Sequence, residues 1–168
     1  MNAFDAVPQF AKMLSNLDAC LQKAIAHAKI KSYEPDILVQ SRLAPDQYSL
    51  VRQVQAACDG AKFCAAYLSE KAAPSDPDNE KTMAELRQRI QACNAYLATF
   101  KPGDFEGWES RKVSPKWLKG KWMRGDQFLM QAALPNFYFH VTTGYAILRH
   151  NGVDLGKVDF IGALPVHD

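Results

Sequence analysis

The sequence lacks the short motifs that mark several common chemistries. It has no His-Glu-x-x-His pattern, no Gly-x-Ser-x-Gly nucleophile turn, no phosphate-binding Gly-x-x-x-x-Gly-Lys loop and no EF-hand loop. Its four cysteines include no Cys-x-x-Cys pair. These absences argue against the familiar zinc proteases, serine hydrolases, nucleotide hydrolases and calcium sensors, and no catalytic residue can be assigned from a motif.

Long apolar runs are also missing. No run approaches the roughly 18 residues that a membrane-spanning helix needs, and residues 1–10 contain no Lys or Arg, so they lack the basic start of a signal peptide. We therefore expect a cytoplasmic protein without a membrane partner. There we expect its cysteines to be reduced, mostly buried and packed as small apolar side chains, namely Cys20, Cys58, Cys64 and Cys93.

Helical periodicity is the strongest positive signal. A length of 168 residues, 48% of them hydrophobic, suits one domain over residues 1–168 with a sizeable core. Apolar residues recur at steps of three and four, which predicts helices over 3–30, 45–69, 80–100 and 126–151. Long helices joined by short connections pack antiparallel, so we expect an all-α four-helix bundle.

Particular residues predict local features of these helices. Thr82 and Glu85 form the pattern of a capping box at the start of the third helix. Pro135 should kink or split the fourth, because proline removes one backbone donor and clashes one turn back. Asp59 and Lys62, three residues apart in the second helix, predict a surface ion pair worth a few tenths of a kcal/mol.

Residues 111–124 carry the positive charge of the chain. They include six lysines and arginines and no acid; since the whole chain has a net charge of +2, the other residues sum to −4. Trp117 and Trp122 are interleaved with these cations, and the pattern predicts a short β-hairpin that turns at Lys119 and Gly120. Lysines commonly protect exposed hairpins from edge-to-edge aggregation. We favour that interpretation over binding of nucleic acid through phosphate contacts and stacked bases.

His140 is the histidine whose position has the most consequence. It lies in the middle of the fourth helix, on a stripe that includes Asn136 and borders the apolar stripe. A buried imidazole needs a hydrogen-bond partner, because leaving it unsatisfied costs a few kcal/mol. One interpretation is a core histidine bonded across the bundle to a glutamine of the 45–69 helix. The other is the wall of a small-ligand or metal pocket, and a metal-free pocket would consist of His140, Asn136 and Gln53.

Several segments resemble a domain-of-unknown-function family grouped with the DinB-like superfamily. Residues 134–153 (LPNFYFHVTTGYAILRHNGV) and 155–162 (LGKVDFIG) carry the most distinctive part of the resemblance. Residues 42–46 (RLAPD) and 53–55 (QVQ) resemble the second helix of the same family, so the likeness spans essentially the whole chain. The resemblance implies a DinB-like four-helix bundle, here with a short β-hairpin between its third and fourth helices, and a homodimer.

The resemblance also places an ancestral metal site. In the DinB-like superfamily, one histidine of the second helix and a His-x-x-x-His pair of the fourth bind a divalent metal. Counting back from the Leu-Arg and Gly-Val pairs that follow, the last of these is His140, and the first of the pair falls at Asn136. With Tyr48 as the aromatic that opens the second helix, the remaining ligand falls near Ala56. Three protein ligands are the usual minimum for a catalytic zinc site, so we expect no metal cofactor here.

These expectations favour an uncharacterised, metal-free DinB-like bundle that binds a small ligand or a protein partner. The alternative is a divalent-metal-dependent DinB-like transferase or hydrolase. Binding of nucleic acid through residues 111–124 is the least favoured of the three.

Overall fold

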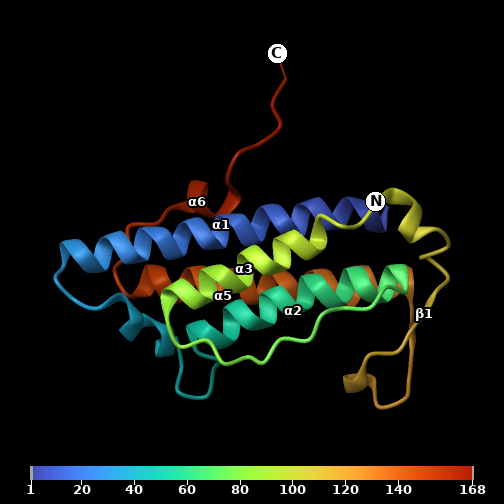
Figure 1. Ribbon diagram of the computed structural model, residues 1–168, viewed down its shortest axis with the longest axis horizontal. Helices are drawn as coiled ribbons and strands as arrows, with labels where there is room; N and C mark the ends of the chain where they lie inside the picture. Colours follow the sequence, from blue (N-terminus) through green and yellow to red (C-terminus); the bar gives the residue numbers. More distant parts are fainter. Residues whose placement is uncertain (1, 168) are drawn as a thin grey trace.

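Four long helices pack around one hydrophobic core in the computed structural model, which describes residues 2–167 (Figure 1). They are α1 (Ala3–Ile30), α2 (Leu50–Ser69), α3 (Met83–Leu97) and α5 (Leu134–His150). α2 packs most extensively on α5, while α3 lies against both α1 and α2. The core contains the fully buried side chains Phe10, Leu14, Leu17, Leu21, Leu50, Leu68, Leu86, Ile90, Leu97 and Phe137. The prediction of a mainly helical four-helix bundle is confirmed.

The first and third helices begin where their sequences place a cap. α1 spans the predicted residues 3–30. At the start of α3, the backbone N–H of Glu85 donates to Thr82 Oγ1 at 3.1 Å, and the N–H of Thr82 donates to the Glu85 carboxylate at 3.0 Å. The capping box is therefore confirmed, although α3 is shorter at both ends than the predicted 80–100.

The second helix begins at Leu50, five residues after the predicted start at residue 45. A 3-10 helix, η1 (Pro35–Gln40), precedes it, and residues 41–49 form an irregular connection. The backbone N–H of Leu50 donates to the carbonyl of Ser41 at 2.9 Å, which closes this connection. Pro45 suits a turn as well as a first helical residue, so the apolar pattern did not separate the two.

The predicted helix 126–151 is present but not regular. α4 (Gly125–Phe128) continues through a π-helical turn, η4 (Leu129–Ala133), into α5. Pro135 is the second residue of α5 and so lies just after this turn. A π-turn admits one extra residue, so the missing N–H and the bulk of the proline ring are accommodated where the backbone already departs from α geometry.

The basic segment forms the expected hairpin at one end of the bundle (Figure 1). Its strands, β1 (Lys112–Val113) and β2 (Met123–Arg124), pair antiparallel, with Lys112 opposite Arg124. A 3-10 turn, η3 (Lys116–Leu118), lies between them, and Lys119 and Gly120 both have positive φ. The turn lies at the predicted dipeptide, but the ladder is only two residues long.

Two further short helices lie outside the four-helix bundle. η2 (Pro102–Phe105) connects α3 to the hairpin, and α6 (Lys157–Ile161) packs against α1. The Asn16 amide donates to the carbonyl of Phe160 at 2.9 Å, and Lys23 pairs with Asp159 at 2.7 Å. Within residues 2–167, no helix combines the length and the hydropathy that crossing a membrane would require.

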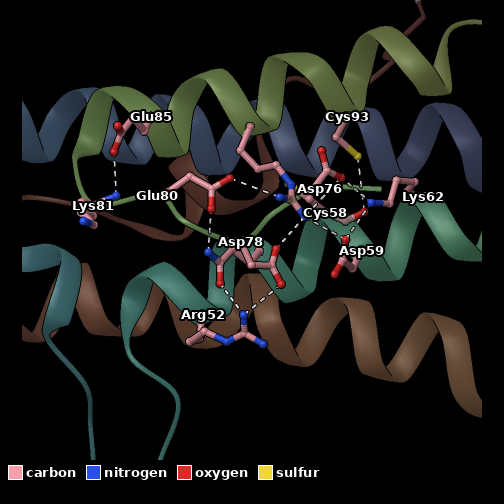
Figure 2. A network of polar contacts seen from close by, with 12 residues as sticks. Arg52, Cys58, Asp59, Lys62, Asp76, Asp78, Glu80, Lys81, Glu85 and Cys93 are labelled. Atoms are coloured by element: carbon pink, nitrogen blue, oxygen red, sulfur yellow. Dashed lines mark hydrogen bonds and ion pairs between the residues drawn. The ribbon is translucent and has the colours of Figure 1, made fainter. Parts of the chain in front are cut away.

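Residues 71–82, which we call the acidic strap, lack regular structure and run along α2 and α3 (Figure 1). Their carboxylates meet two buried cations, and Figure 2 shows the network. The side chain of Arg89 is 4% exposed and lies 2.9–3.4 Å from four carboxylates, which belong to Asp59, Asp76, Asp78 and Glu80.

The strap corrects the expectation for Asp59 and Lys62. The two residues pair at 3.0 Å, but the lysine side chain is only 3% exposed and also bonds Asp76 of the strap. The prediction of a surface pair was wrong, because a periodicity argument treats the helix without the irregular segment that covers it.

Candidate functional site

A cavity of about 720 Å³ opens between α2, the α4–η4–α5 helix and the hairpin. Its wall on α2 follows one helical face, in steps of three and four residues. The opposite wall is made by the fourth helix, and the hairpin loop contributes three consecutive residues. The lining residues are Tyr48, Arg52, Ala56, Asp59, Gly60, Phe63, Cys64, Tyr67, Pro115, Lys116, Trp117, Phe128, Ala132, Ala133, Asn136 and His140.

His140 is held by a hydrogen bond across the bundle. Its Nδ1 lies 2.8 Å from Oε1 of Gln53, whose side chain is fully buried in the first turn of α2. The Gln53 amide nitrogen donates to the carbonyl of Tyr48 at 3.1 Å. Since that carbonyl can only accept, the amide oxygen must face the ring, and Nδ1 must carry the proton that it donates. Nε2 then keeps its lone pair.

Burial favours the neutral form of this ring. Desolvation lowers the pKa of His140, because the charged imidazolium loses hydration in the bundle. The ring stacks on Tyr48 with an interplanar angle of 11° and meets Phe139 edge-on. At neutral pH, His140 is therefore an uncharged group with an acceptor nitrogen.

The site residues predicted from the sequence lie in or directly behind the wall of the cavity. His140 and Asn136 both line the cavity, one helical turn apart, while Gln53 lies behind the wall and bonds His140. Ala56 lines the same cavity from α2. The three positions at which the superfamily resemblance places metal ligands thus face one space.

The residues at these positions do not fit a transition metal. They supply one imidazole nitrogen, one amide and one methyl group, whereas zinc-type sites require about three strong protein donors. Residues 2–167 contain no group of three or more His, Cys, Asp or Glu side chains that could hold a metal ion. We assign no chemistry to a metal in this cavity.

The aromatic residues of the wall were not predicted from the sequence. Phe63 and Tyr67 lie four residues apart on α2, and Tyr67 meets Phe128 edge-on with ring centroids 5.9 Å apart. Trp117 closes the hairpin side and is 61% exposed. One signal could have revealed this face: a second stripe on α2 at Arg52, Ala56, Asp59, Phe63 and Tyr67, beside the apolar stripe.

Charges on the wall are tied to the acidic strap. Arg52 Nη1 bonds both the Gln55 side chain at 2.7 Å and Asp78 at 3.1 Å (Figure 2). Asp59 accepts from Arg89 and from Lys62. Arg52 and Asp59 therefore have opposite-charge partners outside the cavity, and the third charged lining residue, Lys116, is exposed on the hairpin. The interior of the cavity is mostly apolar, with His140 as its neutral polar group.

Burial suppresses the reactivity of Cys64, the cysteine that lines the cavity. All four cysteines are free and buried, as expected from the sequence. Desolvation raises the pKa of Cys64, which lines the cavity, to about 12 and that of Cys20 to about 11. The nucleophilic thiolate is scarce at neutral pH under these conditions.

The hairpin exposes both of its tryptophans. Trp117 and Trp122 are each more than half exposed, and the Lys112 ammonium lies 5.2 Å from the Trp122 ring centroid. Arg111 and Arg124 are engaged with the carboxylates of Glu70 and Asp126. The basic segment is thus partly neutralised by its own surroundings.

Comparison with known proteins gives the family. The model of a domain of unknown function, DUF1993, matches residues 4–161. The chain belongs to this family. A crystal structure of a DinB family member protein from Shewanella denitrificans is 48% identical, with a TM-score of 0.93 over 96% of this chain and 92% of that one. No curated protein matches the sequence. The DUF1993 chain thus has a DinB-like bundle, as its helix sequences indicated.

Proposed function

We propose that this DUF1993 protein binds a small, largely aromatic molecule in the cavity between α2, α5 and the hairpin. The observation that carries the proposal is the composition of the wall: aromatic side chains from three elements enclose one buried polar side chain. The volume of about 720 Å³ lies within the range of roughly 300–1,000 Å³ typical of small-molecule sites.

The geometry of the wall supports an aromatic ligand. Phe63, Tyr67 and Phe128 already form tilted and edge-on pairs with each other. A further ring inserted among them gains contacts worth about 0.5–1.5 kcal/mol per pair beyond the burial of area. Trp117, which is mostly exposed, supplies additional apolar surface that a ligand would remove from water.

Filling the cavity tests the proposal. Ala56 lines the cavity, so Ala56→Trp should abolish binding of aromatic fragments followed by chemical-shift changes in NMR spectra. Ala95→Trp places the same side chain on an exposed position of α3, outside the cavity lining, and should leave binding intact. If fragments bind equally to both variants, the site of binding lies elsewhere and the proposal fails.

Self-association as a homodimer is the second part of the proposal. Of the aromatic residues of α5, Phe137 is buried and Tyr138 and Tyr145 pack partly against the core, but Phe139 is 54% exposed. Met130, nine residues earlier, is exposed as well. A dimer through this surface would cover both. Light scattering should report twice the chain mass, falling toward the monomer mass in Phe139→Lys; a wild-type monomer at high concentration would refute the dimer.

A further inference from the structure

We infer that the cavity selects aromatic ligands that donate a hydrogen bond to Nε2 of His140, such as phenols and compounds with a ring N–H. The inference rests on the proposed function and adds the chemical class of the ligand. It depends on which nitrogen of the ring carries the proton, and the surroundings of His140 decide that.

The protonation pattern follows from a chain of three groups. The carbonyl of Tyr48 accepts from the Gln53 amide nitrogen, and the amide oxygen accepts from Nδ1 of His140. Reversing the amide would set its oxygen against the Tyr48 carbonyl oxygen, two acceptors facing each other, and its NH₂ against Nδ1. The chain therefore runs in one direction and leaves Nε2 as the acceptor.

The position of the ring makes that acceptor selective. The side of the ring that carries Nδ1 faces buried Gln53, while His140 itself lines the cavity and is only 8% exposed. Among residues 2–167, Nε2 meets no hydrogen-bond partner. A hydrogen bond to it forms in surroundings of low polarity, where an unmatched polar group is costly.

The same geometry disfavours two other ligand classes. A ligand group that only accepts hydrogen bonds, such as an ether oxygen, would face the lone pair of His140 Nε2. It would displace a water molecule without replacing the hydrogen bond that the water can donate to Nε2. A carboxylate gains nothing from a neutral imidazole. Two charged side chains of the wall are already paired outside it, Arg52 with Asp78 of the strap and Asp59 with Lys62 and Arg89. The third charged lining residue, Lys116, is exposed on the hairpin, so water and salt screen its attraction for a carboxylate.

Three matched compounds test the inference on the wild-type protein. They are 2-naphthol, 2-methoxynaphthalene and naphthalene, measured by NMR titration at pH 7.5. Naphthalene and 2-methoxynaphthalene are both more apolar than 2-naphthol, so area burial alone would make 2-naphthol the weakest binder. We expect 2-naphthol to bind roughly 3- to 10-fold more tightly than both others, the worth of one net hydrogen bond.

The outcomes separate the inference from the proposed function. Equal binding of all three compounds, blocked by Ala56→Trp, would overturn the donor requirement and leave the aromatic site standing. Failure of all three to bind would overturn the proposed function. In His140→Phe, which keeps a ring against Tyr48, the preference for 2-naphthol should disappear while naphthalene still binds.

The tautomer can be measured without any ligand or variant. In ¹⁵N-labelled protein, the ring nitrogens of His140 should show a protonated Nδ1 and an unprotonated Nε2, and the Nε2 resonance should move on addition of 2-naphthol. A protonated Nε2 in the neutral free protein would overturn the inference, whatever the binding experiments report.

Discussion

Arg89 and Asp59 lie on neighbouring helices with their charged atoms 2.9 Å apart, and the guanidinium is buried while the carboxylate borders the cavity. Three strap carboxylates surround the same guanidinium. Desolvation acts to lower the pKa of Arg89, but the surrounding carboxylates outweigh it and raise the pKa, so the cation persists at every accessible pH.

Removing this cation should destabilise the protein strongly. Arg89→Met leaves several carboxylates close together without their shared partner, and the loss of one member of a buried pair costs about 3–5 kcal/mol. Arg87→Met is the matched control two residues away: Arg87 pairs with Asp18 at 2.6 Å but is 30% exposed, and the expected cost is below about 1 kcal/mol. Urea denaturation measures both, and similar losses would contradict a dominant role for the buried network.

Gly125 should tolerate no side chain. A Cβ atom at this position would lie 1.8 Å from the Trp108 carbonyl oxygen, so the backbone of one segment would have to move. Gly125→Ala should cost about 1–3 kcal/mol or more through overpacking. Gly103→Ala, where a Cβ meets open space, should change the free energy of unfolding by less than about 0.5 kcal/mol. Thermal or urea unfolding of the pair distinguishes the two sites.

The stability of the protein should fall in mild acid because of His140. Its pKa in the folded protein is lowered by burial, whereas the unfolded chain has the ordinary value of about 6.5. Below that pH the unfolded chain binds a proton that the native ring resists, so stability decreases as the pH falls from 6.5 toward the native pKa. The slope due to this residue reaches at most about 1.4 kcal/mol per pH unit. His140→Phe should lose this contribution to the pH dependence of the free energy of unfolding, measured by urea denaturation between pH 5 and 7. If the free energy falls equally steeply with pH in both proteins, His140 does not titrate in this way.

Placing imidazoles at the positions where the superfamily resemblance implies metal ligands should create a metal site. Ala56→His together with Asn136→His adds two imidazoles to the cavity that His140 already lines, giving three possible nitrogen donors. Calorimetric titration with zinc or nickel should then show one ion per chain, since three donors meet the usual requirement. Asn136→His combined with Ala95→His keeps the number of histidines but moves one to α3, and it should not bind stoichiometrically. If the Ala56 variant also fails, the placement of the second-helix ligand at Ala56, which the resemblance implies, is wrong.

Leu97 tests the core of α3. It is 1% exposed, as the apolar pattern of the sequence required. Leu97→Ala should cost about 2–5 kcal/mol, the range for buried leucines. Leu43→Ala in the irregular connection, where the side chain is 44% exposed, should cost much less. A loss below about 0.5 kcal/mol at Leu97 would contradict its burial.

The helices could be predicted because their signals are local. The spacing of Leu14, Leu17 and Leu21, and the capping box at Thr82, act over one or two turns and need no knowledge of distant residues. The start of α2 could not be predicted in this way. It depends on the hydrogen bond from Leu50 to Ser41, which joins residues nine apart across an irregular loop.

The candidate site was predictable in part for the same reason. His140 and Asn136 share a stripe, and a glutamine partner on the second helix is what a buried imidazole requires. The strap and the aromatic wall were not predictable. The burial of Lys62 depends on Asp76, fourteen residues away in a segment without periodicity. Trp117 reaches the cavity only because the hairpin folds against the bundle.

The π-turn η4 lies between α4 and α5, which together form the wall of the cavity opposite α2. It sets the direction in which the side chains of α4 point relative to those of α5. Each residue of an α-helix advances the chain by about 100° around the axis, so the one extra residue of a π-turn rotates Phe128 by that angle relative to His140. With this rotation, both side chains line the same space. Deleting one residue between 129 and 133 would make the helix regular and turn Phe128 and the hairpin away from His140. The core of the bundle would remain, but the cavity would lose the part of its wall that Phe128 and the hairpin form.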